Sequence, residues 1–403
     1  MSRAAVLREP VEPGALWLRW EMPSGLPADE EVRDRLEAEG LFADLLAHPP
    51  EQRMQALRKP CFHQPAFVEL LLERSRDTQL ADPERAEALA LMAASLTVQL
   101  HRPDEDGALV AVFMARAHCL TGNARRLLGS EADAEIAFAN TAYFLARPAG
   151  SCDRAFYGRA LAILRWEQGR TDEALSLLFH AARIFEENGA LSEEGTCLAL
   201  AGLLYVEEGD AGRALGPLRK ARLAAAQPLP PSSRPWLSIR ARLALALALA
   251  DLGHLGRARW MRQEAWRLYA LQTSPEEQFR AQWLEGRIGI RLGSWEEAFD
   301  LLDGVRGKFT AERRLPEAAL VTLDLALLHT EAKRRPEIEP LIEGFAAALG
   351  TEDGSDIALR GLRRCQRDLA AGRDPRESAA GIASYLRRTF RFRGFRVEPL
   401  PFA

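Results

Sequence analysis

One phrase recurs along this chain at a nearly constant interval: an apolar helix-like stretch, a turn that usually begins with glycine, and an alanine five residues later. The turn positions lie 40, 40, 44, 40 and 40 residues apart, and they are Gly129, Gly169, Gly209, Gly253, Gly293 and Lys333. A fixed period of this size is typical of repeat architectures, in which each unit packs mainly against its neighbours. The sequence therefore predicts a solenoid rather than several independent globular domains.

Each repeat has the features of a pair of antiparallel helices. A glycine after an apolar helix adopts the left-handed C′ conformation without a steric penalty, so it ends the first helix. Small residues five positions after the turn permit close helix approach, and they are Ala134, Ala174, Ala214, Ala258 and Ala298. A second set of small residues lies seven positions before the turn, at Gly122, Ala162, Gly202, Ala246, Gly286 and Ala326. We expect helical hairpins whose remaining apolar flank is covered by the next hairpin.

This pattern resembles the tetratricopeptide repeat family, in which a small residue, a turn glycine and two alanines recur in fixed order. The second of those alanines is matched by Ala181, Ala221 and Ala265, although the period of 40 exceeds the usual 34. The stretches 69–75, 122–126, 283–288, 319–326 and 385–388 further resemble high-GC bacterial members, some of which carry an N-terminal anti-sigma-type zinc finger. The ligands of that finger are absent here. The resemblance implies an all-α, right-handed solenoid of about eight antiparallel hairpins.

The repeat pattern also predicts how the chain is divided. Residues 1–60 are expected to be an irregular or helical segment, and 61–106 a divergent hairpin in which Asp82 caps a helix. Six repeats of about 40 residues occupy 107–349, a capping helix pair occupies 350–390, and 391–403 form an Arg/Phe-rich tail. The proline-rich stretch 228–235 contains the four extra residues of the longest interval and is expected to be a loop between hairpins.

Composition excludes several classes of protein. The 53 basic and 57 acidic side chains give a net charge of −4, which argues against a polycation that coats nucleic acid. The five cysteines include no C-x-x-C pair, so a disulfide framework is not expected. The longest apolar run, 243–250, is too short to span a membrane, and the first residues lack the apolar stretch of a secretory signal. We expect a cytoplasmic protein.

No common catalytic signature is present. The chain lacks a phosphate-binding P-loop, a strand-linked G-x-G-x-x-G, an H-E-x-x-H and a G-x-S-x-G. Cys119 could pair in space with a histidine, but a cysteine on a repeat helix is more often a packing residue. We therefore predict no enzyme, catalytic residue, metal or cofactor, and an enzyme of unknown type remains the third hypothesis.

The first helix of each hairpin is expected to line a concave groove. By the family resemblance, the inner positions are those thirteen, ten, six, three and two before each turn, and their spacing places them on one helix face. The candidate groove residues there are Arg116, Asn123, Arg126, Arg159, Trp166, Arg240, Arg280, Trp283, Arg287 and Arg291. Arginine and tryptophan are frequent hot-spot residues, and by the family resemblance Asn123 matches an asparagine that grips a peptide backbone or terminal carboxylate.

These residues predict a non-catalytic scaffold or adaptor that binds a protein or peptide, through an acidic segment or a C-terminal carboxylate, in a groove partly open to solvent. The alternative is that an arginine-rich composition places arginine on any solvated face. A rival function is a ligand-responsive regulator that acts through the tail on nucleic acid or an effector. The arginines of that tail, interleaved with phenylalanines, are Arg387, Arg388, Arg391, Arg393 and Arg396. An extended tail packed on the last hairpin explains the same alternation.

Overall fold

The computed structural model describes residues 28–79, 82–100, 107–146, 150–226, 234–268, 275–311 and 315–332, together with positions 337, 340–341 and 371. Within these residues the regular structure is helical, and no strand occurs. The helices before the repeats are α1 (Ala28–Leu46), α2 (Pro50–Ala56), a 3₁₀ turn (Pro60–Phe62), α3 (Pro65–Thr78) and α4 (Pro83–Leu100). The repeat helices are α5 (Gly107–Leu127), α6 (Glu131–Leu145), α7 (Ser151–Glu167), α8 (Thr171–Glu187), α9 (Leu191–Glu207), α10 (Ala211–Ala224), α11 (Arg234–Asp251), α12 (Leu255–Trp266), α13 (Pro275–Leu292), α14 (Trp295–Ala311) and α15 (Leu315–Glu331). The predicted all-α class is confirmed.

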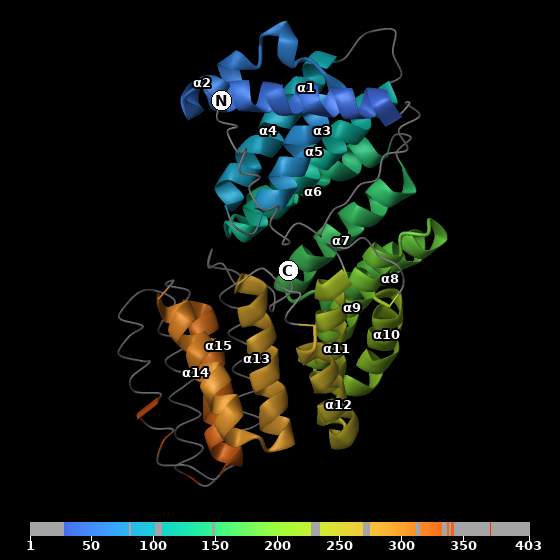
Figure 1. Cartoon of the computed structure of the whole chain (residues 1–403). Helices are drawn as coiled ribbons and strands as arrows, with labels where there is room; N and C mark the ends of the chain where they lie inside the picture. Colours follow the sequence, from blue (N-terminus) through green and yellow to red (C-terminus); the bar gives the residue numbers. More distant parts are fainter. Residues whose placement is uncertain are drawn as a thin grey trace, which may run out of the picture.

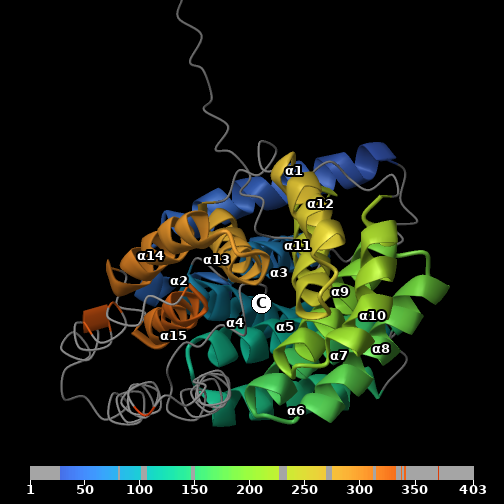
Figure 2. The ribbon, with the colours of Figure 1, turned by 90° about the horizontal axis from the view of Figure 1, so that it is seen from below.

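The hairpins follow one another around a common axis (Figure 1). Viewed along that axis, the first helices α5, α7, α9, α11 and α13 lie inside, and the second helices α6, α8, α10, α12 and α14 lie at the periphery (Figure 2). We call these the inner and outer helices. Most described side chains of the inner helices are buried or half-buried, whereas the outer helices keep one face in water.

The predicted turn glycines end the inner helices in the left-handed conformation. Gly129, Gly169, Gly209, Gly253 and Gly293 have φ between 74° and 81°. At the first of these turns, the Ser130 N–H donates to the Arg125 carbonyl (2.9 Å) and the Gly129 N–H to the Arg126 carbonyl (3.0 Å). This is the Schellman pattern, which satisfies the last carbonyls of the helix. The turn chemistry read from the sequence is confirmed.

The small residues seven before the turn bring the two helices of a hairpin together, as predicted. A Cβ added at Gly202 would lie 2.4 Å from Cγ of Leu218, and one at Gly286 would lie 2.6 Å from Cγ of Leu302. Any side chain there would therefore push the helices apart. The alanines five positions after the turn are also all buried: Ala134, Ala174, Ala214, Ala258 and Ala298.

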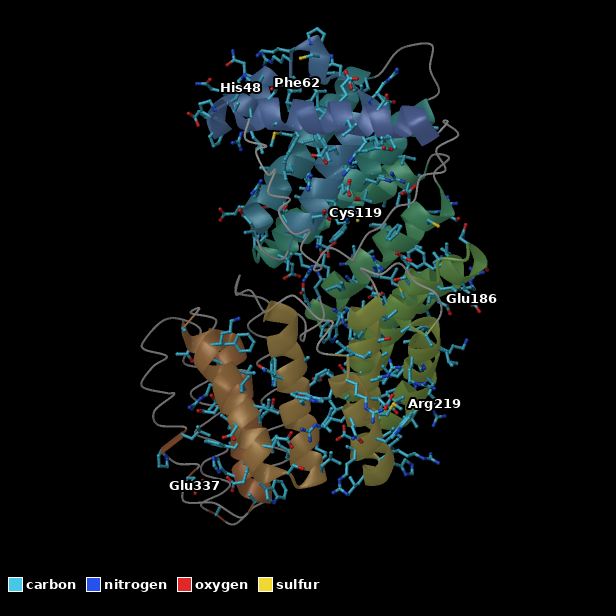
Figure 3. The ribbon with its side chains drawn as sticks, viewed as in Figure 1. His48, Phe62, Cys119, Glu186, Arg219 and Glu337 are labelled. Carbon is cyan, nitrogen blue, oxygen red and sulfur yellow. The ribbon has the colours of Figure 1, made fainter. Side chains whose placement is uncertain are left out.

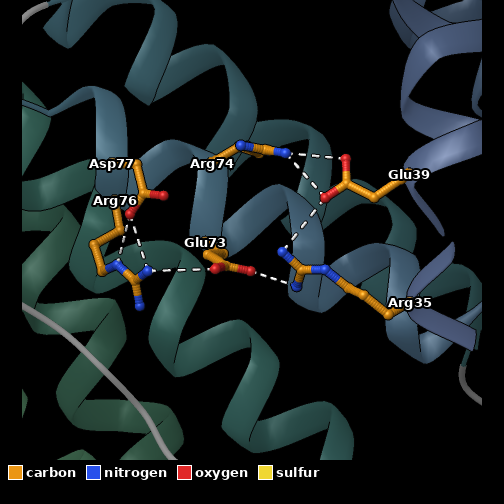
Figure 4. Close-up of polar contacts among 6 residues, drawn as sticks. All are labelled: Arg35, Glu39, Glu73, Arg74, Arg76 and Asp77. Carbon is orange, nitrogen blue, oxygen red and sulfur yellow. Dashed lines mark hydrogen bonds and ion pairs between the residues drawn. The ribbon is translucent and has the colours of Figure 1, made fainter. Parts of the chain in front are cut away.

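The region before the repeats contains the expected divergent hairpin, α3 and α4. Asp82 caps α4, because its Oδ1 accepts the Arg85 N–H at 3.0 Å. Helix α1 crosses this hairpin and is tied to α3 by charged side chains (Figure 4). Glu39 of α1 accepts from Arg74 at 2.9 Å, and Arg35 of α1 pairs with Glu73 of α3.

Several predicted segments cannot be compared with the structure. The described residues do not include the first 27 residues, the second helix of the sixth repeat apart from positions 337 and 340–341, the C-terminal pair 350–390 apart from position 371, or the tail 391–403. The tail arginines Arg387, Arg388, Arg391, Arg393 and Arg396 therefore lie outside the described residues. No helix in the described ranges is both long and apolar enough to cross a membrane.

Candidate functional site

The candidate groove residues do lie on inner helices, but the expectation that they are open to solvent is wrong for most of them. Trp166 is 5% exposed and Trp283 is 3% exposed. Five of the arginines are buried as well: Arg116, Arg126, Arg159, Arg240 and Arg287. Asn123 and Arg291 are half-buried, and the side chain of Arg280 lies outside the described residues.

Between α5 and α7 the buried arginines are held by carboxylates from the next repeat. Nε of Arg116 donates to Oδ1 of Asp153 at 2.8 Å, and Arg126 is paired with Glu167. Asn123 bridges this group to the preceding hairpin: its Oδ1 accepts from Nε of Arg126 at 3.0 Å, and its Nδ2 donates to Gln79 at 2.9 Å. Three consecutive hairpins are thus linked through one run of polar contacts.

A second group links α9, α11 and α13. Nη1 of Arg287 donates to Oε1 of Glu207 at 2.7 Å, and Nε of Arg291 donates to Oδ1 of Asp251 at 3.0 Å. Burial by itself would lower the pKa of Arg287, but Glu207, Asp324 and Asp251 together raise that pKa above its ordinary value. The guanidinium of Arg287 is therefore fixed as a cation inside the array.

The two tryptophans are part of the packed interior. Nε1 of Trp283 donates to Oδ2 of Asp324 at 2.7 Å, and its ring meets Phe309 edge-on with centroids 5.8 Å apart. Trp166 belongs to the main hydrophobic core. The sequence places both on the inner helix face correctly, but it does not show which neighbouring helices cover that face.

Arg159 lies beside two cysteines and two aromatic rings. Its guanidinium carbon sits 5.2 Å from the centroid of Phe156 and 5.8 Å from that of Phe185, a cation–π arrangement. Burial raises the pKa of both Cys119 and Cys197 to about 12. These thiols are therefore protonated at neutral pH, and a nucleophilic role for Cys119 is not supported.

The carboxylates that hold the arginines were not identified from the sequence. Glu167, Glu207 and Asp251 all stand two residues before a turn glycine, in three consecutive repeats. An acid that recurs at one inner position was the available signal. We refer to the following as the inner-face pairs: Arg116–Asp153, Arg126–Glu167, Arg287–Glu207 and Arg291–Asp251.

The inner-face pairs do not form a metal site. In the described part of the chain, no group of three or more His, Cys, Asp or Glu side chains is gathered as a metal would require. A guanidinium has five donors, so an arginine that binds one carboxylate has the donors to bind a second.

No protein-family model matches this chain, and no curated protein is similar to it by sequence. Its structure is similar to that of a Rap protein solved in complex with competence and sporulation factor, with a TM-score of 0.54 and 13% identity over 82% of this chain and 96% of that one. It is also similar to the apo form of RapI, with a TM-score of 0.53 and 11% identity over 90% and 97% of the two chains. These similarities show the fold, an all-α helical-repeat solenoid.

Proposed function

We propose that this protein is a non-catalytic helical-repeat scaffold that binds a protein or peptide on the inner face of its array. The observation that carries the proposal is the concentration of paired charges on buried inner helices. A buried ion pair adds little net stability and is often replaceable by apolar residues without loss. Recognition of a charged partner would account for charges at these positions. The solved Rap complex, which aligns along most of its length, is consistent with such a role.

The chemistry of the inner face favours a carboxylate-bearing partner. Arg116 and Arg126 are buried against Asp153 and Glu167, so an acidic side chain or C-terminus of a partner would reach them by opening the contact between α5 and α7 and taking the place of one of these carboxylates. Asn123 stands beside Arg126 and offers an amide to a peptide backbone. The remaining proposed contacts along the same inner face are Arg159, Arg240, Arg280, Arg287 and Arg291.

The test is a binding measurement on the full chain with pooled random pentapeptides, made with either a free or an amidated C-terminus and detected by native mass spectrometry. We expect the free-carboxylate pool to be retained preferentially, by about tenfold in affinity. The double variant Arg126→Met/Glu167→Met removes both charges while keeping volume, so it should fold normally and lose this preference. Single removal of Arg126 is less informative, because it leaves a buried charge.

A matched control is the variant Arg165→Met/Glu135→Met. This pair also joins two helices, α7 and α6, but Glu135 lies on an outer helix and is half-buried. Its loss should leave peptide binding unchanged. Equal retention of the two pools, or equal loss in both double variants, would contradict the proposed site.

A further inference from the structure

The outer helices differ sharply in charge. Helix α6 carries three carboxylates and no arginine, and α8 carries four carboxylates and one arginine. Helix α14 carries four carboxylates and two cations. Helix α10 has three arginines, one lysine and no carboxylate, and α12 has three arginines and one glutamate. Figure 3 shows Glu186 on α8 and Arg219 on α10 at the outer edge of the array. A basic band two helices wide therefore lies between acidic neighbours.

The cations of this band share the outward face with large apolar side chains. Positions four, seven, ten, eleven and fourteen after the turn glycine lie on one side of an outer helix. Six exposed residues at these positions, on α10, on α12 and directly after α12, form what we call the basic ridge: Arg219, Lys220, Leu223, Arg257, Trp260 and Arg267. The other exposed residues at such positions are Arg213, Gly216 and Gln263. Leu223 is 55% exposed and Trp260 is 54% exposed.

The positive charge of the ridge is only partly neutralised. Among the described residues Arg219 and Arg257 have no ion pair, while Arg267 is paired with Glu264. Arg242 of α11 is not a ridge residue, but it lies between the two outer helices and its pKa responds to the charges around it. Burial lowers its pKa, Arg222 of α10 lowers it further, and Glu264 of α12 opposes the shift. Cations from α10 and α11 thus lie close enough to repel one another.

We infer that the basic ridge is a second docking surface, which binds an acidic amphipathic segment of a partner protein. Exposed leucine and tryptophan flanked by arginine and lysine complement a helix that has an apolar stripe and acidic edges. The ridge lies on the opposite side of the array from the inner-face pairs, so the two surfaces can act independently.

The surroundings of the ridge favour a narrow protein segment over other anions. Two helices side by side span about 20 Å, which suits one docked helix. A flat anionic membrane would also meet the carboxylates of α8 and α14 and would be repelled by them. Trp260 is the one aromatic side chain among the six ridge residues, whereas single-strand binders stack successive bases on several aromatic side chains.

The test uses fluorescence anisotropy of the full chain with a labelled, amidated peptide of ~18 residues built from leucine, alanine and glutamate with a helical leucine stripe. Arg219→Glu/Arg257→Glu should weaken binding at least about tenfold, and Trp260→Ala should also weaken it. These residues are exposed, so the variants should fold. The matched control is Arg183→Glu, an exposed charge reversal on α8, which should leave affinity unchanged.

Three outcomes would overturn the inference. One is equal binding of a peptide with the same composition but a scrambled stripe. Another is equal loss of affinity in Arg183→Glu. The third is binding of an oligothymidylate, or of phosphatidylcholine vesicles containing phosphatidylserine, that is lost in Arg219→Glu/Arg257→Glu while peptide binding is not. The Arg126→Met/Glu167→Met variant should bind the amidated peptide normally, which separates this surface from the inner-face proposal.

Discussion

The N-terminal helices and the inner helices of the array are both joined by arginine–carboxylate pairs, but at very different burial. Between α1 and α3, the side chains of Arg35 and Glu73 are 44% and 34% exposed. Between α5 and α7, those of Arg126 and Glu167 are 2% and 9% exposed. An exposed pair is worth about 0.2–1 kcal/mol and weakens with salt, whereas a buried pair is costly to break but adds little net stability. Arginine–carboxylate pairs therefore position α1 on the protein surface in one region, and they keep charged groups in the interior of the array in the other.

The largest effect should follow from breaking one inner-face pair. Arg287→Ala removes the buried cation that pairs with the carboxylate of Glu207, and we expect a loss of about 3–5 kcal/mol in the free energy of unfolding. Arg291→Ala, one turn further along α13, removes a half-buried cation and should lower the free energy of unfolding far less. Denaturant unfolding of both variants measures the contrast, and equal losses would contradict the assigned difference in burial.

A second prediction concerns Glu285, whose side chain is almost fully buried on α13. Burial raises its pKa to about 7, and Arg262 of α12, 3.8 Å away and shared with Glu297 of α14, only partly opposes this. The folded state therefore binds more protons than the unfolded state between about pH 4.5 and pH 7, so stability falls across that window, by about 3 kcal/mol, and is then level.

Replacing Glu285 by Gln should remove this pH dependence and raise the free energy of unfolding at about pH 8. Glu297→Gln, an exposed neighbour on the same arginine, serves as the control and should keep the slope. Unfolding followed by circular dichroism at several pH values measures both. A slope that persists in Glu285→Gln would show that another group titrates.

The smallest effect is expected in the N-terminal network. Glu73→Gln removes the carboxylate that meets Arg35 and Arg76, and should cost no more than about 1 kcal/mol because these side chains are partly in water. The loss should shrink further at high salt. A loss as large as that of Arg287→Ala, independent of salt, would mean that the two regions do not differ as described.

The sequence predicted the hairpins well because their determinants are local. Gly129 and its equivalents need a left-handed φ, and Gly202 contacts Leu218 on the other helix of the same hairpin. Both requirements leave a periodic trace in the sequence. The all-α class and the turn positions followed directly.

The candidate site was predicted less completely because the burial and the partners of its side chains depend on contacts between repeats. Helical spacing identified the face that carries Trp166 and Trp283, but burial depends on the neighbouring helices that cover this face. Arg287 and Glu207 lie 80 residues apart, which no local pattern connects. Only the recurrence of an acid two positions before the turn glycine pointed to them, and it was not read as a partner for arginine.

The central claim is that a partner binds the inner face of the array. Hydrogen–deuterium exchange of the full chain, measured with and without the free-carboxylate pentapeptides, tests it most directly. The account predicts that the peptides slow exchange in the inner helices α5 and α7 and leave the outer helices α6 and α8 unchanged. Slowing confined to α6 and α8, or no change in α5 and α7 at saturating peptide, would contradict it.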